Sequence, residues 1–231
     1  MKLPVSVIVP TIHERAVFLR EKCLPAINAN GEMDVIVVND HGNGSLKRNK
    51  GAAFSTQPYL LFVDDDCVLT GSAVTEMLAE LEKNPQAAFV YSDYNRIVLP
   101  GVESHAPSGL FQAGPFDLKR LRVSNYINTT SLIRKSACPT WDEEFEKFQD
   151  WDFWLTVAEG GGVGIYIQKA LYDLYQIDRS VSTRINPTKY TQMMVLKHRL
   201  DLGPDPKNDW QDGRGHMHAG SISRRLAQGL G

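Results

Sequence analysis

Three short runs of apolar, mostly β-branched residues constrain the fold of this chain most strongly. They are VSVIV at 5–9, DVIVV at 34–38 and YLLFV at 59–63. Near-continuous runs of this length are typical of strands that are buried on both faces, as in a parallel sheet covered by helices. The sequence therefore predicts an α/β fold built on a parallel sheet.

Helical segments separate these runs. Residues 16–27 have an apolar spacing that suits a helix, with Pro25 as a kink or an early stop. Residues 71–85 repeat apolar positions at i, i+3, i+4 and i+7, with Ser72 placed as an N-cap and Pro85 at the end. The βαβαβα order predicts a doubly wound, Rossmann-like, mostly parallel sheet, in which ligands bind outside the carboxyl ends of the strands.

The rest of the chain predicts a mixed region followed by a helical tail. We expect strand at 87–99, an irregular loop at 100–117, renewed order at 128–137, an amphipathic helix at 148–161, strand at 164–177 and a helix from Pro187 to about Leu200. Residues 201–220 are polar and rich in helix breakers, which predicts a lid or a poorly ordered tail, and residues 221–231 suit a short terminal helix.

Polar segments follow the predicted strands at the edge where ligands bind. They are PTIHER at 10–15, NDHGNGS at 39–45 and the aspartates Asp64, Asp65 and Asp66. Adjacent carboxylates repel one another, and a divalent cation offsets that repulsion. Mg²⁺ or Mn²⁺ held by one or two carboxylates usually completes its shell with substrate phosphates and water. The triplet therefore suggests a metal–diphosphate site, with a solvated acidic turn as the alternative.

A basic segment just before the third run supports a diphosphate site. Lys47, Arg48 and Lys50 precede Gly51 and several small residues. Cations and free backbone N–H groups beside a metal suit a diphosphate, although an exposed basic turn would have the same composition. The chain has neither a GxxxxGK[ST] loop nor a GxGxxG loop, so neither a P-loop NTPase nor a dinucleotide oxidoreductase fits.

Composition argues against a few other classes. The formal net charge of −2 gives no overall field that would recruit nucleic acid or an anionic membrane. The three cysteines form no CxxC pair, as expected for reduced thiols in a cytoplasmic protein. No window approaches the ~20 apolar residues of a membrane span, so we expect a soluble or peripheral protein.

Four blocks, in order, resemble the family 2 glycosyltransferases of the GT-A fold. They are VSVIVPTIHER, VIVVNDHGNGS, RNKGAAFSTQPYLLFVDDDCVL and NTTSLIRKSACPTWDEEFEKFQDWDFWLTVAEGG, between about residues 4 and 178. The resemblance implies a metal-dependent, inverting transfer of a sugar from a nucleotide diphosphate sugar, a UDP-sugar above all, with Mn²⁺ or Mg²⁺. The family's processive QxxRW motif is not in the sequence, which favours transfer of a single sugar.

The resemblance also implies roles for residues around the nucleotide. Pro10, Thr11, Glu14 and Asp40 would line the nucleoside pocket, with Asp40 accepting a hydrogen bond from the base, and Arg48 would contact the diphosphate.

The acidic triplet, Asp64 to Asp66, matches the family's DxD motif. Asp64 and Asp65 would approach the ribose and the sugar, and Asp66 would bind the metal. A further metal ligand sometimes comes from the C-terminal region of the family, where the candidates are Asp178, His198, His216 and His218. His216 and His218 also suit a simple tail.

QDWDFW at 149–154 resembles the segment that carries the family's general base, which would make Asp150 the base. Inversion by direct displacement needs one carboxylate opposite the leaving diphosphate, and such a base typically contributes ~10²- to 10⁴-fold. Asp152 is the second candidate. Trp151 and Asp152 are our candidates for acceptor contacts. An acid in the first turn of a helix is the structural alternative for Asp150.

The sequence departs from the family pattern at three places. A helix and strand usual before the RNKG block are missing, Gln149 replaces an acid before the expected base, and Asp178 stands where a histidine is common. We expect a catalytic domain at 1–186, with a nucleotide-sugar half at 1–99 and an acceptor half at 100–186, and a C-terminal helix and tail at 187–231.

Two rival functions remain at this point. One is a nucleotidyltransferase of related fold, although PTIHER lacks the glycines of the usual loop. The other is a non-catalytic module that binds a nucleotide sugar or a glycan. The acceptor is open among a glycan, a lipid-linked carrier, a protein and a modified nucleic-acid base.

Overall fold

The computed structural model describes residues 2–102, 107–177 and 185–201. Its strands form one eight-stranded sheet in the order β2-β1-β3-β7-β5-β8-β4, with β6 paired to β5. The strands are β1 Val5–Pro10, β2 Asp34–Val38, β3 Tyr59–Phe62, β4 Cys67–Leu69, β5 Phe89–Val98, β6 Gly109–Phe111, β7 Leu132–Arg134 and β8 Gly164–Gln176.

The helical elements separate and cover these strands. They are η1 His13–Arg15, α1 Ala16–Phe18, η2 Leu19–Cys23, α2 Leu24–Asn28, α3 Gly44–Phe54, α4 Ala73–Lys83, α5 Leu118–Leu121, η3 Lys135–Ala137, α6 Gln149–Glu159 and α8 Pro187–His198.

The sheet has a parallel half and a mixed half, as the sequence predicts. β1 lies between β2 and β3 and is parallel to both. β7 runs antiparallel to β3 and β5, whereas β8 runs parallel to β5 and antiparallel to β4. The loop expected at 100–117 also contributes β6, which pairs antiparallel with β5.

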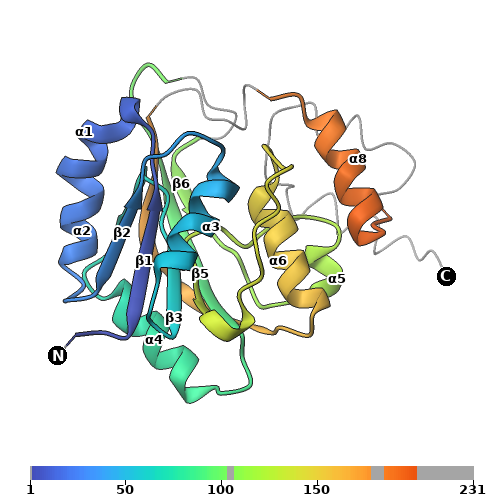
Figure 1. Ribbon diagram of the computed structural model, residues 1–231, viewed down its shortest axis with the longest axis horizontal. Helices are drawn as coiled ribbons and strands as arrows, with labels where there is room; N and C mark the ends of the chain where they lie inside the picture. Colours follow the sequence, from blue (N-terminus) through green and yellow to red (C-terminus); the bar gives the residue numbers. More distant parts are fainter. Residues whose placement is uncertain (1, 103–106, 178–184, 202–231) are drawn as a thin grey trace.

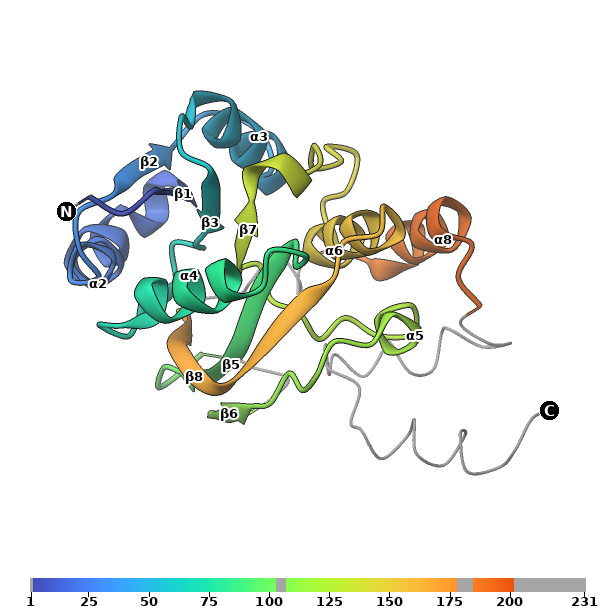
Figure 2. The same ribbon diagram turned by 90° about the horizontal axis from the view of Figure 1, so that it is seen from below.

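Helices cover both faces of the sheet, which explains the continuous apolar runs. The α1–α2 segment and α4 lie on one face, and α3, α6 and α8 lie on the other (Figures 1 and 2). Alternate side chains of β1 enter different cores: Val7 packs on the α1–α2 side and Ile8 on the α3 and α6 side. β1 is therefore buried at every position.

The first helix continues past Pro25, where we expected a kink or a stop. The chain passes through α1, the π-helical η2 and α2 up to Asn28, and Pro25 lies in the first turn of α2. Proline has no N–H to donate, and the wider π turn before it changes the hydrogen-bond pattern where that donor is missing.

The basic segment forms α3 and not an exposed turn. Its N-cap Asn43 accepts a hydrogen bond from the Leu46 backbone N–H at 3.0 Å. Gly51 lets the helix approach β1 closely, because a Cβ there would lie 2.3 Å from Cγ2 of Ile8. This close packing holds Arg48, one turn earlier, against the sheet.

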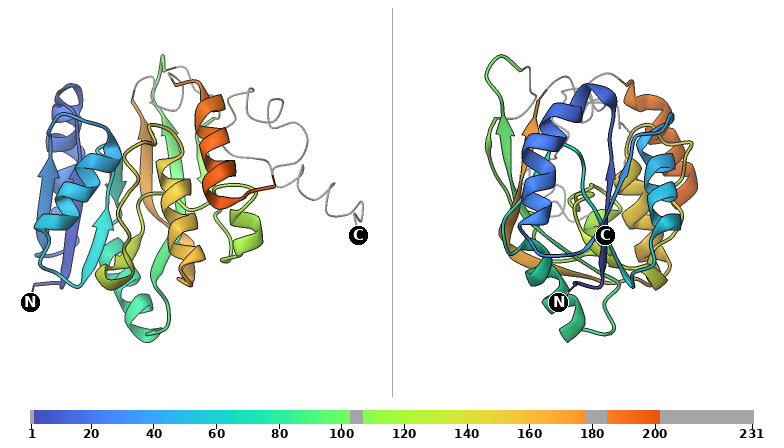
Figure 3. Two further views of the ribbon diagram at one scale, coloured as in Figure 1. Left: turned by 45° about the vertical axis from the view of Figure 1, so that its right-hand side comes forward. Right: turned by 60° about the vertical axis from the view of Figure 1, so that its left-hand side comes forward.

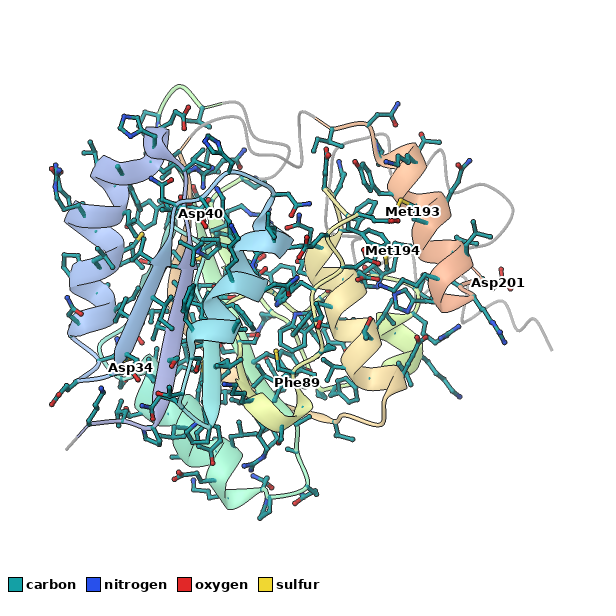
Figure 4. The ribbon with its side chains drawn as sticks, viewed as in Figure 1. Asp34, Asp40, Phe89, Met193, Met194 and Asp201 are labelled. Carbon is teal, nitrogen blue, oxygen red and sulfur yellow. The ribbon has the colours of Figure 1, made fainter. Side chains whose placement is uncertain are left out.

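The C-terminal helix packs beside α6. Figures 3 and 4 show α8 next to α6, and the buried Met194 points between them. The predicted helix from Pro187 is thus confirmed up to His198. The predicted lid or tail and the short terminal helix lie outside the described residues, apart from Asp201.

Candidate functional site

The carboxyl ends of β1, β2 and β3 bring the predicted segments to one edge of the sheet. Pro10 ends β1 and is followed by Thr11, while Asp40 follows β2. Figure 4 shows Asp40 at this edge and Asp34, the first residue of β2, at the opposite edge. The acidic triplet follows β3 at the same edge as Asp40, since β3 is parallel to β1.

The acidic triplet is neutralised largely by two arginines. Asp64 Oδ1 accepts a hydrogen bond from Arg48 Nη2 at 2.6 Å. Arg15 Nη1 donates to Asp65 Oδ1 at 2.9 Å and to Asp66 Oδ2 at 2.6 Å. Thr11 Oγ1 donates to the other oxygen of Asp65 at 2.8 Å. The mutual repulsion of the carboxylates is therefore offset by protein cations and a hydroxyl group.

Burial shifts the pKa of Asp66. Desolvation raises the pKa of Asp66 to about 7 against the lowering effect of Arg15, and Asp64 and Asp65 add to the increase. A divalent cation would reverse this balance, because it favours the ionised carboxylate.

Arg48 connects the triplet to the start of α6. While Nη2 contacts Asp64, Nη1 donates to Gln149 Oε1 at 2.9 Å. The guanidinium carbon also lies 4.7 Å from the ring centroid of Trp141. Arg48 is thus a fixed cation, with its side chain 8% exposed.

The two lysines of α3 differ in environment. Lys47 is buried and donates to the Thr11 carbonyl at 2.7 Å. Lys50 forms an exposed ion pair with Asp40 at 2.7 Å, and the hydrogen bond from Lys50 lowers the pKa of Asp40. Glu14, also expected in the nucleoside pocket, lies exposed on η1.

Asp150 lies in the first turn of α6 with both carboxylate oxygens engaged. The backbone N–H of Trp151 donates to Oδ1 at 2.9 Å, and Asn125 Nδ2 donates to Oδ2 at 2.8 Å. Burial raises the pKa of Asp150 to about 6 in spite of these two hydrogen bonds. The carboxylate is therefore ionised at neutral pH yet able to take up a proton.

A pocket adjoins Asp150. It encloses about 190 Å³, including space open to solvent, and is lined by Tyr94, Phe111, Asn125, Tyr126, Ile127, Asn128 and Asp150. Phe148, just before α6, has φ 63° and ψ 23°, a left-handed conformation that is uncommon for a bulky residue. This turn sets the direction in which the first residues of α6 leave the loop.

The structure does not bring Trp151 or Asp152 to the pocket, contrary to the acceptor contacts that we expected. Trp151 is 1% exposed, and its Nε1 donates to the Leu121 carbonyl at 2.6 Å. Asp152 is 2% exposed and contacts Lys197 and His198 of α8. Successive helical residues point in directions about 100° apart, so these two side chains leave the face that carries Asp150.

Of the four candidates for a further metal ligand, only His198 lies among the described residues, and the contacts of its ring are with the side chains of α6. His198 lies between two carboxylates: its Nε2 is 2.8 Å from Asp152 Oδ1, and its Nδ1 is 2.8 Å from Glu159 Oε2. Asp178, His216 and His218 lie outside the described residues. Within the described ranges, no group of three or more His, Cys, Asp or Glu side chains is arranged to hold a metal ion.

The donor set nevertheless fits a cation that is held mainly by substrate. Mg²⁺ and Mn²⁺ sites with one or two carboxylates are completed by phosphates and water. Within the described part of the chain, Asp64 Oδ2 accepts no hydrogen bond, and Asp66 Oδ1 has only the Cys67 sulfur, 4.0 Å away. Asp66 would hold such an ion, which would polarise a bound diphosphate.

Sequence reasoning missed two polar residues of this site. Arg15 belongs to the PTIHER segment but was given no role, and Asn125 lies in a stretch without a recognisable motif. The charge of Arg15 beside an acidic edge was the available signal. Asn125 had none, because its contact with Asp150 joins separate parts of the chain.

Comparison with known proteins finds a family match over part of the chain. Residues 43–141 match the family model described as glycosyl transferase family 2. This segment contains Arg48 and the acidic triplet and ends before Asp150. No curated protein matches the chain in sequence.

Solved structures share the fold. S. aureus TarS has a TM-score of 0.61 at 16% identity over 91% of this chain and 42% of that chain. S. aureus TarS 1-349 in complex with UDP-GlcNAc has a TM-score of 0.59 at 16% identity, covering 88% of this chain and 68% of that chain. The complex with UDP has a TM-score of 0.58 at 16% identity, covering 87% and 68%.

These matches confirm the GT-A-type α/β fold, and they are unequal in coverage. The chain spans less than half of the longer TarS chain, of which it covers 42%. None of the helices in residues 2–102, 107–177 and 185–201 has the length and apolar character of a membrane span.

Proposed function

We propose that this chain, a member of glycosyl transferase family 2 through its residues 43–141, moves one sugar from a UDP-sugar to an acceptor hydroxyl with inversion. The observation that carries the proposal is the position of Arg48. One of its nitrogens contacts Asp64 of the triplet and another contacts Gln149, the residue before Asp150. These contacts support a single site in which a cation suited to a diphosphate lies near a carboxylate suited to proton removal.

UDP is the nucleotide that we propose, because S. aureus TarS, which shares the fold, binds UDP and UDP-GlcNAc. Pro10, Thr11, Glu14 and Asp40 would surround its nucleoside. Asp64 and Asp65 would face the ribose and the sugar. Lys50 already pairs with Asp40, so nucleoside binding would compete with that exposed ion pair.

Mn²⁺ or Mg²⁺ would be held by Asp66 and, when bound, would stabilise the leaving diphosphate. Arg48 would contribute the protein's own positive charge beside the same phosphates. It can act without reorganisation, since Trp141 and Gln149 already fix its guanidinium.

Asp150 would remove the proton of the acceptor hydroxyl as that oxygen attacks the anomeric carbon. The pocket beside Asp150 provides a place for the acceptor. A pKa of about 6 keeps the carboxylate mostly ionised at pH 7 and leaves it basic enough to accept a proton in the transition state.

The first test is donor binding. UDP with Mn²⁺ should raise the melting temperature of the full chain, because a ligand that binds only the folded state stabilises it. No increase with any nucleoside diphosphate, with or without metal, would contradict the proposal.

The second test separates binding from chemistry. Asp150→Asn should keep UDP affinity and reduce turnover by about 10²- to 10⁴-fold, as measured with a panel of UDP-sugars and mass analysis of acceptors. In the unsubstituted enzyme, kcat/KM should fall as the pH falls through about 6, because the protonated carboxyl cannot act as a base. Undiminished turnover in the variant would remove Asp150 from this role, and binding without any turnover would indicate a non-catalytic module.

A further inference from the structure

Arg15 is a charged residue at the acidic edge that the proposed reaction does not use. It ends η1, directly after the loop that follows β1. One of its terminal nitrogens contacts two carboxylates of the triplet, at 2.9 Å to Asp65 and at 2.6 Å to Asp66. The side chain is 15% exposed, so these contacts are shielded from most of the solvent.

The two carboxylates that hold Arg15 differ in how firmly they are fixed. Asp65 is 8% exposed in its side chain, and its second oxygen accepts the Thr11 hydroxyl hydrogen bond at 2.8 Å. Asp66 is 16% exposed, and its second oxygen has only the sulfur of Cys67 at 4.0 Å among the described residues. Asp65 is therefore the fixed anchor of Arg15, and Asp66 is the partner more easily exchanged.

The charges at this edge favour joint entry of metal and diphosphate. The three carboxylates are balanced by Arg15, Arg48 and the buried Lys47, which donates to the carbonyl of Thr11 beside them, so their formal charges cancel. A free divalent ion would leave an excess positive charge at this edge and would crowd the Arg15 guanidinium. A metal that carries a diphosphate brings two negative charges with it, and its phosphate oxygens offer Arg15 a new partner of the kind arginine binds well.

We propose that Arg15 occupies the cation position of the acidic triplet while the donor is absent, and that it exchanges Asp66 for a phosphate oxygen when the metal and the nucleotide bind together. Asp65 retains Arg15 throughout. This inference rests on the proposed function, since it assumes the metal–diphosphate site. In this inference Arg15 has two effects: Arg15 excludes free metal, and Arg15 binds the donor.

Direct metal binding tests the proposal without measuring activity. Free Mn²⁺ is titrated by electron paramagnetic resonance against the full chain, in the absence of nucleotide, for the unsubstituted protein and for Arg15→Gln. We expect Arg15→Gln to bind Mn²⁺ about tenfold more tightly, because the competing cation is gone, and to bind UDP in saturating Mn²⁺ about tenfold more weakly. Arg20→Gln is the matched control, since Arg20 is exposed and pairs with Glu21 away from the triplet.

A second measurement uses the unsubstituted protein alone. UDP should increase the affinity for Mn²⁺, and Mn²⁺ should increase the affinity for UDP by the same factor. Arg15→Gln should reduce this mutual enhancement, and Arg15→Lys, which keeps the charge, should preserve part of it. The comparison with Arg15→Lys remains informative if Arg15→Gln folds poorly.

The outcomes separate this inference from the proposed function. Unchanged affinity for free Mn²⁺ in folded Arg15→Gln, with normal binding of UDP and Mn²⁺ by the unsubstituted protein, would overturn the role of Arg15 alone. Equal loss in Arg20→Gln would do the same, because it would show a general charge effect. Failure of the unsubstituted protein to bind UDP under any metal condition would instead overturn the proposed function and this inference with it.

Discussion

At the scale of single residues, the environment of Asp150 determines how it can act. Its two oxygens accept hydrogen bonds from the Trp151 backbone and the Asn125 side chain. The backbone donor is fixed by the helix, whereas the Asn125 donor depends on its side chain. Asn125 is therefore a positioning residue, which acts on the reaction through the orientation and the pKa of Asp150.

Asn125→Ala should shift the acid limb of the kcat/KM profile to higher pH. The hydrogen bond from Asn125 lowers the pKa of Asp150, so its loss raises that pKa, by roughly half a unit to one unit for a bond of about 1 kcal/mol. Asn128→Ala, at another position in the same pocket, is the control and should leave the limb in place. If kcat/KM fell equally at every pH and the acid limb stayed at the same pH, Asn125 would only shape the pocket.

The sequence predicts which kinds of residue form this site better than it predicts which side chains contact one another. Arg48 and the triplet could be identified because they lie in contiguous blocks at the ends of predicted strands. The contacts Arg15–Asp66 and Asn125–Asp150 join residues far apart in the chain, and no periodicity encodes such a pairing. Trp151 was misplaced for a related reason, since an aromatic residue beside a functional acid suits both a pocket and a core.

At the scale of elements, α8 is held to α6 by a charged cluster centred on the buried pair His198 and Asp152. His198 contacts Asp152 and Glu159, Lys197 contacts Asp152 and Asp142, and Arg122 contacts Glu159. Arg122 also donates to the carbonyl groups of His198 and Arg199 at 2.8 Å. These contacts fix α8 against the helix that begins with Gln149 and Asp150.

His198→Gln should lower stability, and more so at acid pH. Burial opposes the charge of His198, but the hydrogen bonds to Asp152 and Glu159 outweigh it and raise the pKa of the imidazole. The stabilisation is therefore complete below the ordinary value of 6.5 and is lost as the pH rises through the higher folded-state value. We expect a loss of about 2 kcal/mol in unfolding free energy at pH 6 and a smaller loss at pH 9.

Denaturant unfolding of the two proteins across this pH range checks the prediction. His41→Gln is a suitable control, because His41 is exposed. A loss that stays the same between pH 6 and pH 9 would contradict a charged His198 and would indicate a packing effect.

Most helices and strands could be predicted, because buried strands and amphipathic helices have different apolar periods. The early stop predicted at Pro25 is wrong, because the chain passes from the π-helical η2 into α2 and stays helical to Asn28. The prediction also missed β6 within a segment rich in glycine and proline, since a three-residue edge strand has too few positions to show a pattern.

At the scale of the whole molecule, α3 joins the parallel half of the sheet to the segment that leads into α6. Asn49 Nδ2 donates to the Trp141 carbonyl at 2.9 Å, and the Trp141 backbone N–H donates to Asn49 Oδ1 at 2.8 Å. Arg48, also on α3, contacts Gln149, the residue before Asp150. This coupling was not predictable, because the sequence identifies the two halves separately and says nothing of which side chains cross between them.

Gln149→Glu tests whether a charge at this contact affects both the binding of the diphosphate and the pKa of Asp150. The new carboxylate would compete with the diphosphate for Arg48 and should weaken UDP binding about threefold to tenfold. It would also place a negative charge beside Asp150, which raises the pKa of Asp150 and moves the acid limb of kcat/KM above its value of about 6. Calorimetry with UDP and a pH–rate profile measure the two effects.

Gln149→Ala separates charge from geometry in the same contact. It removes the hydrogen bond to Arg48 without adding a carboxylate, so it should leave the acid limb near its original position and free Arg48 for the phosphates. The electrostatic role of Arg48 predicts two results. Gln149→Glu should bind UDP more weakly and move the acid limb of kcat/KM, and Gln149→Ala should leave that limb unmoved. If both variants moved the limb equally, the contact would act by positioning α6, and the charge carried by residue 149 would be irrelevant to the base.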